Sequence, residues 1–168
     1  MGRIKASSPE ASRRMTKVRQ TGTKAEMALR RELHRLGLRY RVNFQVLKKP
    51  RRIADVAFTK LKIAVYVDGC FWHGCPEHAS WPKSYSEFWQ QKIEANRARD
   101  VDTDAKLKEI GWTVIRIWEH ERPEMAANAL KTVIDTIRNG ATPSLRPKND
   151  DNEEDTDGTH ESSGRRKL

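Results

Sequence analysis

One short segment, residues 68–78 with the sequence DGCFWHGCPEH, combines side chains suited to three kinds of chemistry. Its cysteines and histidines are the ligand types that bind zinc, and both cysteines of the chain lie here. Its carboxylate and its histidines can bind a metal ion or transfer protons during catalysis. Because glycines flank its two adjacent aromatic side chains, we expect a loop that joins a metal site, a catalytic group and an aromatic surface.

The spacing of cysteine and histidine predicts a zinc site. Cys70, Cys75 and His78 supply three ligands, and a structural zinc site needs four in a tetrahedron. His73 shares the same short segment, whereas His120 follows a predicted strand whose end can lie beside the loop. We expect zinc to be bound by Cys70, Cys75, His78 and His120, with no open position for catalysis. The alternative is a pair of free, buried cysteines.

Two aspartates lie where they can bind a catalytic cation. Asp55 lies within the apolar sequence IADVAF, where an ionised carboxylate is costly unless a cation or strong donors meet it. Asp68 ends the next apolar segment, and a hairpin brings both aspartates to the same end of the sheet. We expect them to bind Mg²⁺, which prefers oxygen ligands. The alternative is that Asp55 caps a turn or pairs with Arg51 or Arg52.

Glu26 is a third candidate carboxylate, beside an arginine-rich stretch of the first predicted helix. The sequence TKAE, residues 23–26, matches a capping box, in which the glutamate accepts a hydrogen bond from the start of the helix. Capping alone explains this residue, so a catalytic role is the second interpretation.

The aromatic residues of the loop are candidates for contact with DNA. Phe71 and Trp72 lie between glycines, and Trp89 lies early in the second predicted helix. Apolar side chains that insert between base steps kink DNA and detect mispaired positions through its deformability. The alternative is a small core packed on the zinc site.

The charge distribution indicates a polyanionic partner. The net charge is +10, and residues 1–50 carry 14 Lys and Arg against 3 Asp and Glu, whereas residues 151–168 carry 3 against 6. Neutralisation of phosphates is the simplest explanation for so many cations in one segment. The alternative is a solvated arm without a partner. The arm residues expected to grip the DNA backbone are Arg13, Arg14, Lys17 and Arg19.

The predicted elements form a single mixed α/β domain with a central sheet and helices on both faces. We expect a basic arm over residues 1–22, a domain over residues 23–140 and a disordered acidic tail over residues 141–168. Neither a secretory signal nor a membrane-spanning segment is recognisable, so we expect a cytoplasmic protein. In chain order, we expect a helix at 23–36, strands at 38–46, 53–58 and 62–67, a loop at 68–82, a helix at 84–110, a strand at 112–118 and a helix at 123–138.

Five segments together resemble the very short patch repair (Vsr-type) DNA mismatch endonucleases over roughly residues 13–135. They are TKAEMALRRELHRLGLRYR, IADVAF, IAVYVDGCFWHGCPEH, PKSYSEFWQQKIEANRARD and LKEIGWTVIRIWEHE. The resemblance implies a restriction-endonuclease-like fold and Mg²⁺-dependent nicking of duplex DNA next to the T of a T:G mismatch. It also implies a structural zinc ion, aromatic residues wedged into the DNA and an N-terminal arm that clamps the duplex.

The resemblance assigns roles by position. Asp55 corresponds to the Mg²⁺ aspartate, Glu26 to a glutamate of the first helix and His73 to the catalytic histidine. Phe71, Trp72 and Trp89 correspond to the wedge, while Asn96 and Asp100 match polar positions that support the site, with Asn96 also expected to contact DNA.

Two positions depart from the family. Many members carry His where this chain has Asp68, and the zinc set here contains Cys75, His78 and His120 in place of the common pattern. Asp68 therefore adds negative charge and a possible bond to Mg²⁺.

The sequence thus predicts a monomeric mismatch endonuclease that acts on duplex DNA at the bacterial nucleoid. Other repair proteins are candidate partners. Two alternatives stay open at this point. One is a nuclease of the same fold that cuts other mismatches or a sequence site, and the other is a non-catalytic, zinc-stabilised DNA-binding module.

Overall fold

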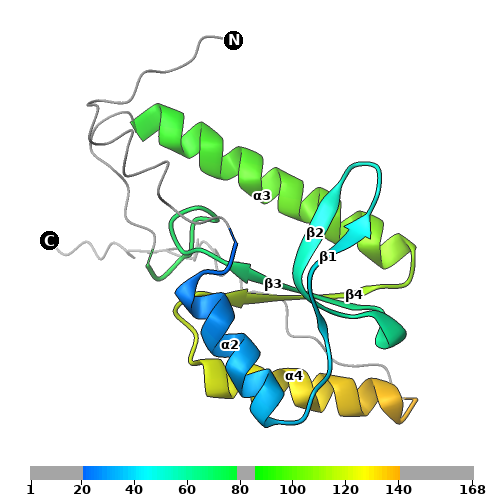
Figure 1. The fold of residues 1–168 in the computed structure, drawn as a ribbon. Coiled ribbons are helices and arrows are strands. Elements are labelled where there is room, and N and C mark those ends of the chain that lie inside the picture. The colour runs from blue at the N-terminus through cyan, green and yellow to red at the C-terminus, as the bar shows by residue number, and fades with distance from the viewer. Residues whose placement is uncertain (1–20, 79–85, 141–168) are drawn as a thin grey trace, which may run out of the picture.

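A computed structural model describes residues 21–78 and 86–140 of the chain, and within them a four-stranded sheet lies between helices (Figure 1). The basic arm and the acidic tail that the sequence predicts lie almost entirely outside these residues. The described elements are α2 (Lys24–Arg35), β1 (Arg41–Leu47), β2 (Arg52–Phe58), the 3₁₀ turn η1 (Thr59–Leu61), β3 (Ile63–Asp68), α3 (Ser86–Glu109), β4 (Thr113–Trp118) and α4 (Pro123–Arg138).

The sheet is mixed and follows the order β1-β2-β3-β4. β1, β2 and β3 pair antiparallel, which confirms the predicted hairpin, and β4 pairs parallel to β3. The parallel ladder runs from Ile63 opposite Thr113 to Asp68 opposite Trp118, so both strands end at the same edge. This edge carries the loop after β3, and the candidate site lies there.

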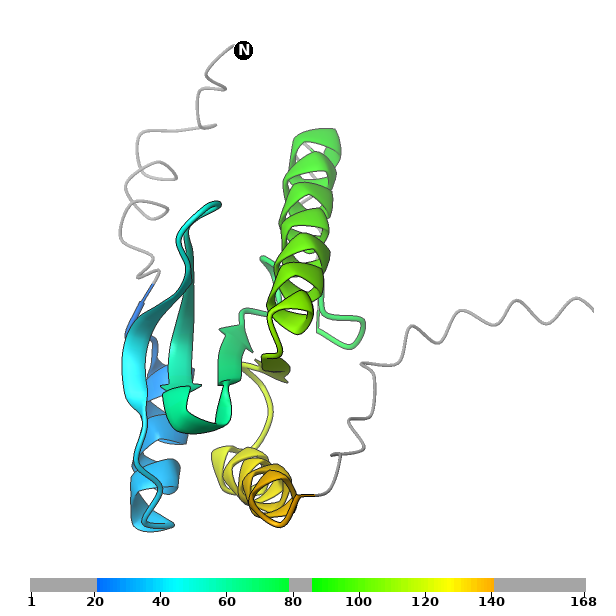
Figure 2. The ribbon, with the colours of Figure 1, turned by 90° about the vertical axis from the view of Figure 1, so that its right-hand side faces the viewer.

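The two faces of the sheet are covered by different helices, as the sequence predicts. In Figure 1, α3 crosses one face, and α2 and α4 lie side by side on the other. The larger core, between the sheet and α2 and α4, includes Leu33, Ile63, Leu130 and Ile134, all of which are fully buried. On the α3 side, Leu107 packs near Trp112, and the β1–β2 hairpin rises beside the helix (Figure 2).

The predicted element bounds hold to within a few residues, and the largest difference is at the first strand. The sequence predicts a strand from residue 38, but β1 begins at Arg41. Gly37, with φ of +72°, and Leu38 donate hydrogen bonds back to carbonyls of the last turn of α2, so residue 38 closes the helix. Among the described residues, no helix has the length and apolar character needed to cross a membrane.

Candidate active site and metal centre

Asp55 is a partly buried carboxylate at the end of the ladder between β2 and β3. Its Oδ2 accepts a hydrogen bond from the backbone N–H of Val67 at 2.8 Å. Burial raises the pKa of Asp55 to about 6, the Val67 bond opposes this rise, and the nearby charges of Glu26 and Asp68 add to it. A carboxylate that is hard to ionise in this way is a ready ligand for a hard cation, because the cation supplies the missing positive charge.

Glu26 caps α2, as the sequence predicts, and is also linked to the backbone of Asp55 through Arg30. Its carboxylate accepts hydrogen bonds from Gly22 and Thr23 N–H groups, at 2.9 and 3.3 Å, and the reciprocal bond from Glu26 N–H to the Thr23 hydroxyl completes the capping box. Arg30 donates to Glu26 Oε2 at 2.9 Å and to the carbonyl of Asp55 at 3.2 Å. The start of α2 is therefore tied to the strand that carries Asp55.

Asp68 lies in a different setting from the one that the sequence suggests. Both of its oxygens accept hydrogen bonds from Nη1 of Arg116, at 3.0 and 3.2 Å, and the residue is buried. Asp68 thus binds the guanidinium of a residue on β4, whereas the sequence predicts that it binds Mg²⁺ together with Asp55. The suggested pairing of Asp55 with Arg52 is wrong, because Arg52 instead binds Asp102 at 3.1 Å.

The loop after β3 is held against α3 by bonds to its backbone. Asn96 donates to the carbonyl of Trp72 at 2.9 Å, and Arg97 donates to the carbonyls of His73 and Gly74. Gly74 has φ of +62°, and a Cβ there would lie only 2.9 Å from the guanidinium of Arg97, so only glycine fits this close approach. The positions of the loop side chains therefore depend on α3.

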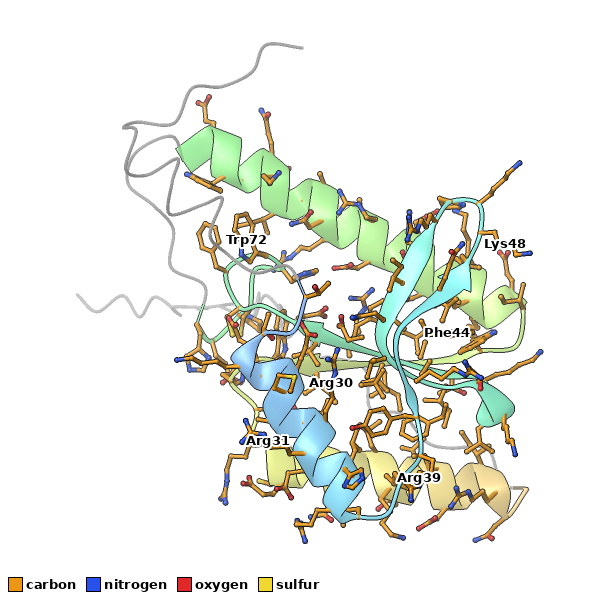
Figure 3. All side chains as sticks on the ribbon, viewed as in Figure 1. Arg30, Arg31, Arg39, Phe44, Lys48 and Trp72 are labelled. Carbon is orange, nitrogen blue, oxygen red and sulfur yellow. The ribbon has the colours of Figure 1, made fainter. Side chains whose placement is uncertain are left out.

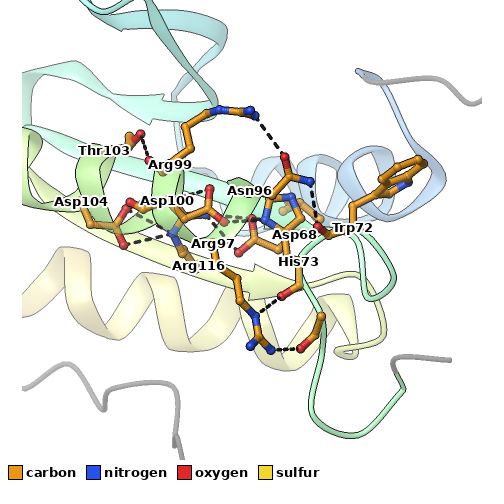
Figure 4. A network of polar contacts seen from close by, with 12 residues as sticks. Asp68, Trp72, His73, Asn96, Arg97, Arg99, Asp100, Thr103, Asp104 and Arg116 are labelled. Carbon is orange, nitrogen blue, oxygen red and sulfur yellow. Dashed lines mark hydrogen bonds and ion pairs between the residues drawn. The ribbon is translucent and has the colours of Figure 1, made fainter. Parts of the chain in front are cut away.

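His73 forms a histidine–aspartate pair at the centre of this arrangement (Figure 4). Its Nδ1 lies 2.6 Å from Oδ2 of Asp100 on α3 and 3.9 Å from Oδ1 of Asp68. An ionised carboxylate can only accept hydrogen bonds, so this geometry assigns the proton to Nδ1. Nε2 is then the nitrogen that can accept a proton or contact a substrate.

The three aromatic residues predicted to contact DNA form one cluster. Ring centroids of Phe71 and Trp72 are 5.1 Å apart, those of Phe71 and Trp89 are 5.3 Å apart, and those of Trp72 and Trp89 are 5.9 Å apart, all edge-on. Each residue is only partly buried. Figure 3 shows Trp72 on the loop beside α3, away from Lys48 of the β1–β2 turn. The cluster therefore presents apolar surface beside the His73 pair.

Four residues form a candidate metal centre, and they are the four that the sequence predicts as zinc ligands: Cys70, Cys75, His78 and His120. One ligand atom from each lies within 4.8 Å of all the others. Sγ of Cys70 and Nδ1 of His120 are 3.1 Å apart, close to the roughly 3.5 Å between ligands that zinc bond lengths imply. Glu77 lies 3.6 Å from Nε2 of His120, where a carboxylate can orient a metal-binding imidazole.

The environment of Cys70 favours a bound cation. Burial, the neighbouring Cys75 thiol and the charge of Glu119 raise the pKa of Cys70 to about 11. A metal ion supplies a positive charge and removes the thiol proton. The Cys70 N–H also donates to Glu119 at 2.7 Å, which ties the loop to the residue that follows β4.

The arm residues Arg13, Arg14, Lys17 and Arg19 lie outside the described residues. Arg116, in contrast, was not predicted as a site residue, although the sequence contains a signal. It is the only charged residue within the apolar strand sequence TVIRIW, and such a residue requires a buried partner.

Comparisons with known proteins point to one family. A profile of the family DNA mismatch endonuclease Vsr matches residues 6–78. The type II nicking enzyme V.NaeI of Lentzea aerocolonigenes is 42% identical over 132 residues, which cover 75% of each chain. V.NmeDIP, a type II nicking enzyme of Neisseria meningitidis serogroup C, is 44% identical over 60% of this chain and 67% of its own. DNA mismatch endonuclease Vsr of Escherichia coli strain K12 is 32% identical over 64% of this chain and 68% of its own.

The raised pKa of Asp55 predicts a pH-dependent stability. A carboxyl group whose pKa is higher in the folded state contributes stability below its unfolded pKa, and this contribution is lost as pH rises through about 6. At about 1.4 kcal/mol per pKa unit, Asp55→Asn is expected to gain on the order of 2 kcal/mol over the unsubstituted chain between pH 4 and pH 8. The measurement is urea unfolding across this range without added divalent cations.

Asp135→Asn is the matched control, because this carboxylate is exposed on α4. Its stability is expected to follow that of the unsubstituted chain at every pH. If the stability of Asp55→Asn also follows that of the unsubstituted chain at every pH, the pKa of Asp55 is not raised in the folded protein.

Proposed function

Because this chain belongs to the Vsr family and is therefore a DNA endonuclease, we propose that it nicks one strand of duplex DNA next to the T of a T:G mismatch. One observation carries the proposal: the loop after β3 bears His73, which pairs with Asp100 of α3, and two members of the aromatic cluster, and Asp55 bonds the end of the same strand. Family membership excludes the non-catalytic DNA-binding module that the sequence left open. The mixed sheet with its helices fits an α/β nuclease fold, here proposed to be restriction-endonuclease-like.

Asp55 is proposed to hold Mg²⁺ together with a backbone carbonyl nearby. The fit rests on the partly buried carboxylate and its raised pKa, since a hard oxygen donor whose ionisation nearby Arg30 favours only in part suits this ion. When bound, Mg²⁺ acts as a Lewis acid that stabilises charge on the scissile phosphate. The sequence also suggested Asp68 as a ligand, but its bonds to Arg116 favour Asp55 as the principal carboxylate. Glu26 orders the start of α2 and adds negative charge beside Asp55.

His73 is proposed to act on the attacking water or on the phosphate. With Nδ1 bonded to Asp100, its Nε2 is available to accept the proton of the water. Asp100 then stabilises the imidazolium that forms, as carboxylates do beside catalytic histidines. Asn96 and Arg97 support this step by fixing the loop backbone, which limits the movement of the imidazole.

Recognition of the mismatch is proposed to depend on Phe71, Trp72 and Trp89. Their edge-on packing makes a rigid apolar wedge, and unstacking costs less at a mispaired step than at a paired one. Asn96 already bonds the backbone of Trp72, so its contribution to DNA binding is proposed to be indirect. The arm cations Arg13, Arg14, Lys17 and Arg19 are proposed to neutralise backbone phosphates.

The Cys and His cluster is proposed to hold a structural zinc ion that shapes the loop. Two thiols and two imidazoles form a complete tetrahedral set, which leaves no position for a substrate. We further propose that the protein acts as a monomer in the bacterial cytoplasm, with other repair proteins as possible partners.

Nicking of a T:G duplex tests the proposed reaction directly. Purified protein with Mg²⁺ is expected to cut the strand that contains the T, and Asp55→Asn is expected to slow single-turnover nicking by about a thousandfold or more. DNA affinity and zinc content are expected to persist, because neither depends on this carboxylate. Asp135→Asn serves as the control with unchanged rate.

The choice of duplexes tests the specificity. Paired DNA and duplexes with other mismatches are expected to be cut more slowly than T:G. Equal cutting of these duplexes would contradict the T:G assignment and favour the nuclease with broader specificity. Full activity of Asp55→Asn would contradict its role as the Mg²⁺ ligand.

Loss of a cysteine tests the zinc proposal. Cys75→Ser is expected to reduce bound zinc from one ion per chain toward none and to lower the melting temperature by roughly 10 °C, because metal binding stabilises the folded loop. The measurements are elemental analysis and thermal unfolding. His34→Gln, at an exposed histidine of α2, is expected to change neither quantity. A zinc content that is unaltered in Cys75→Ser would refute the assignment.

Removal of a wedge residue tests the aromatic cluster. Trp72→Ala is expected to weaken binding to a T:G duplex by 1–3 kcal/mol, about the range found for base–aromatic stacking, and to leave binding to a paired duplex nearly unchanged. Fluorescence anisotropy on both duplexes measures this difference. An equal loss on both would show that Trp72 supports the fold of the loop without recognising the mismatch.

A further inference from the structure

Arg116 is a largely buried cation that touches three carboxylates. Its side chain is 11% exposed, and its guanidinium lies over the ring of Tyr66, its register partner on β3, at 4.8 Å from the ring centroid. It donates to Asp68, contacts Asp100 Oδ1 at 3.2 Å, and donates to Asp104 from Nη2 at 2.9 Å (Figure 4). One strand residue therefore connects the end of β3 with two positions of α3.

The charges of this network require the guanidinium. Three carboxylates and one guanidinium leave an excess of negative charge, and His73 lies between Asp68 and Asp100. Burial disfavours the charged form of Arg116, but the hydrogen bonds that it donates to Asp104 and attraction to all three aspartates raise its pKa above the ordinary value. The side chain thus stays charged, and without it the three neighbouring carboxylates, of which Asp68 is buried, would repel one another.

Asp100 links Arg116 to the histidine. Its Oδ1 contacts the guanidinium at 3.2 Å, and its Oδ2 lies 2.6 Å from Nδ1 of His73. With one oxygen held by a planar donor, the carboxylate has little freedom to rotate, and the other oxygen stays aimed at Nδ1. The guanidinium also places a positive charge beside Asp100.

We propose that Arg116 is a positioning residue for the nicking reaction: through Asp100 and Asp68 it fixes the imidazole of His73, with Nε2 directed to the substrate. The inference rests on the proposed catalytic role of His73. It also gives Asp68 a function. This carboxylate lies 3.9 Å from Nδ1 of His73, and as the last residue of β3 it accepts hydrogen bonds from Arg116. Arg116 itself touches neither metal nor DNA in this assignment.

Arg116→Lys tests the inference because lysine keeps the charge but lacks the planar fork that reaches three carboxylates. It is expected to slow single-turnover nicking at saturating DNA and Mg²⁺ by 10- to 100-fold, about the cost of misplacing a reacting group by 1 Å. The dissociation constant for the duplex and the zinc content are expected to stay unchanged, because the side chain is buried away from both.

Asp104→Asn is the matched control. Asp104 bonds the same guanidinium but does not contact His73, and it is 39% exposed. Its nicking rate is expected to stay within about twofold of the unsubstituted chain, as for most surface substitutions. A loss of rate in both variants that follows their loss of stability in urea would show a purely structural role and overturn the inference.

The tautomer of His73 gives a second readout that needs no activity. In ¹⁵N spectra at constant pH, with the signal assigned through His73→Gln, the unsubstituted chain is expected to carry its proton on Nδ1. Arg116→Lys is expected to shift His73 toward a mixture of tautomers, whereas Asp104→Asn is not. An unchanged tautomer in Arg116→Lys, or an unchanged nicking rate in the folded variant, would overturn the inference.

The two readouts separate this inference from the proposed function. If the unsubstituted chain nicks a duplex other than T:G, the same comparison of rates is made on that duplex. If it nicks none, the proposed reaction fails, and the tautomer measurement alone decides whether Arg116 positions His73.

Discussion

The parallel pairing of β3 with β4 is the constraint on which both halves of the site depend. It brings Asp68 opposite Trp118, so that the loop after β3 and the turn after β4 leave the sheet at the same edge. Cys70 consequently meets His120, two residues beyond the last pair of the ladder, and its N–H reaches Glu119. A shift of the register by one residue would turn Arg116 to the opposite face of the sheet and separate it from Asp68 and α3.

Negative charge at this edge is divided between two kinds of partner. Asp68 and Asp100 are both paired with Arg116 within the protein, whereas the carboxylate of Asp55 accepts a backbone hydrogen bond and has a raised pKa. A carboxylate that the protein does not neutralise is the one best suited to a catalytic cation, since the ion then removes an unfavourable charge as it binds. The pairing of Asp68 and Asp100 with Arg116 therefore supports Asp55 as the carboxylate proposed to hold the ion.

Local patterns in the sequence were enough to predict most of the fold. The capping box of Thr23 and Glu26 and the apolar period behind it predicted α2, and two short β-rich segments predicted the hairpin of β2 and β3. The candidate metal cluster was predicted as well, because His120 follows a strand whose end can lie beside the loop. The partner of Asp68 was not, since it depends on the register between β3 and β4, and no local pattern encodes that register.

The interface of α3 with the sheet has an unusual character that suits this role. Beside the buried Leu107, much of the contact consists of polar and charged groups: Arg52 bonds Thr103 and Asp102, and Arg116 bonds Asp100 and Asp104. Buried ion pairs add little net stability, because desolvation offsets their attraction. They are, however, directional, and an arginine fork allows one arrangement of its carboxylates. An apolar interface would let α3 slide or rotate slightly, whereas these polar contacts fix its position. α3 in turn bonds the backbone of the loop that carries His73. The polar contacts thus determine where His73 lies, and the apolar core on the other face supplies the stability that they do not.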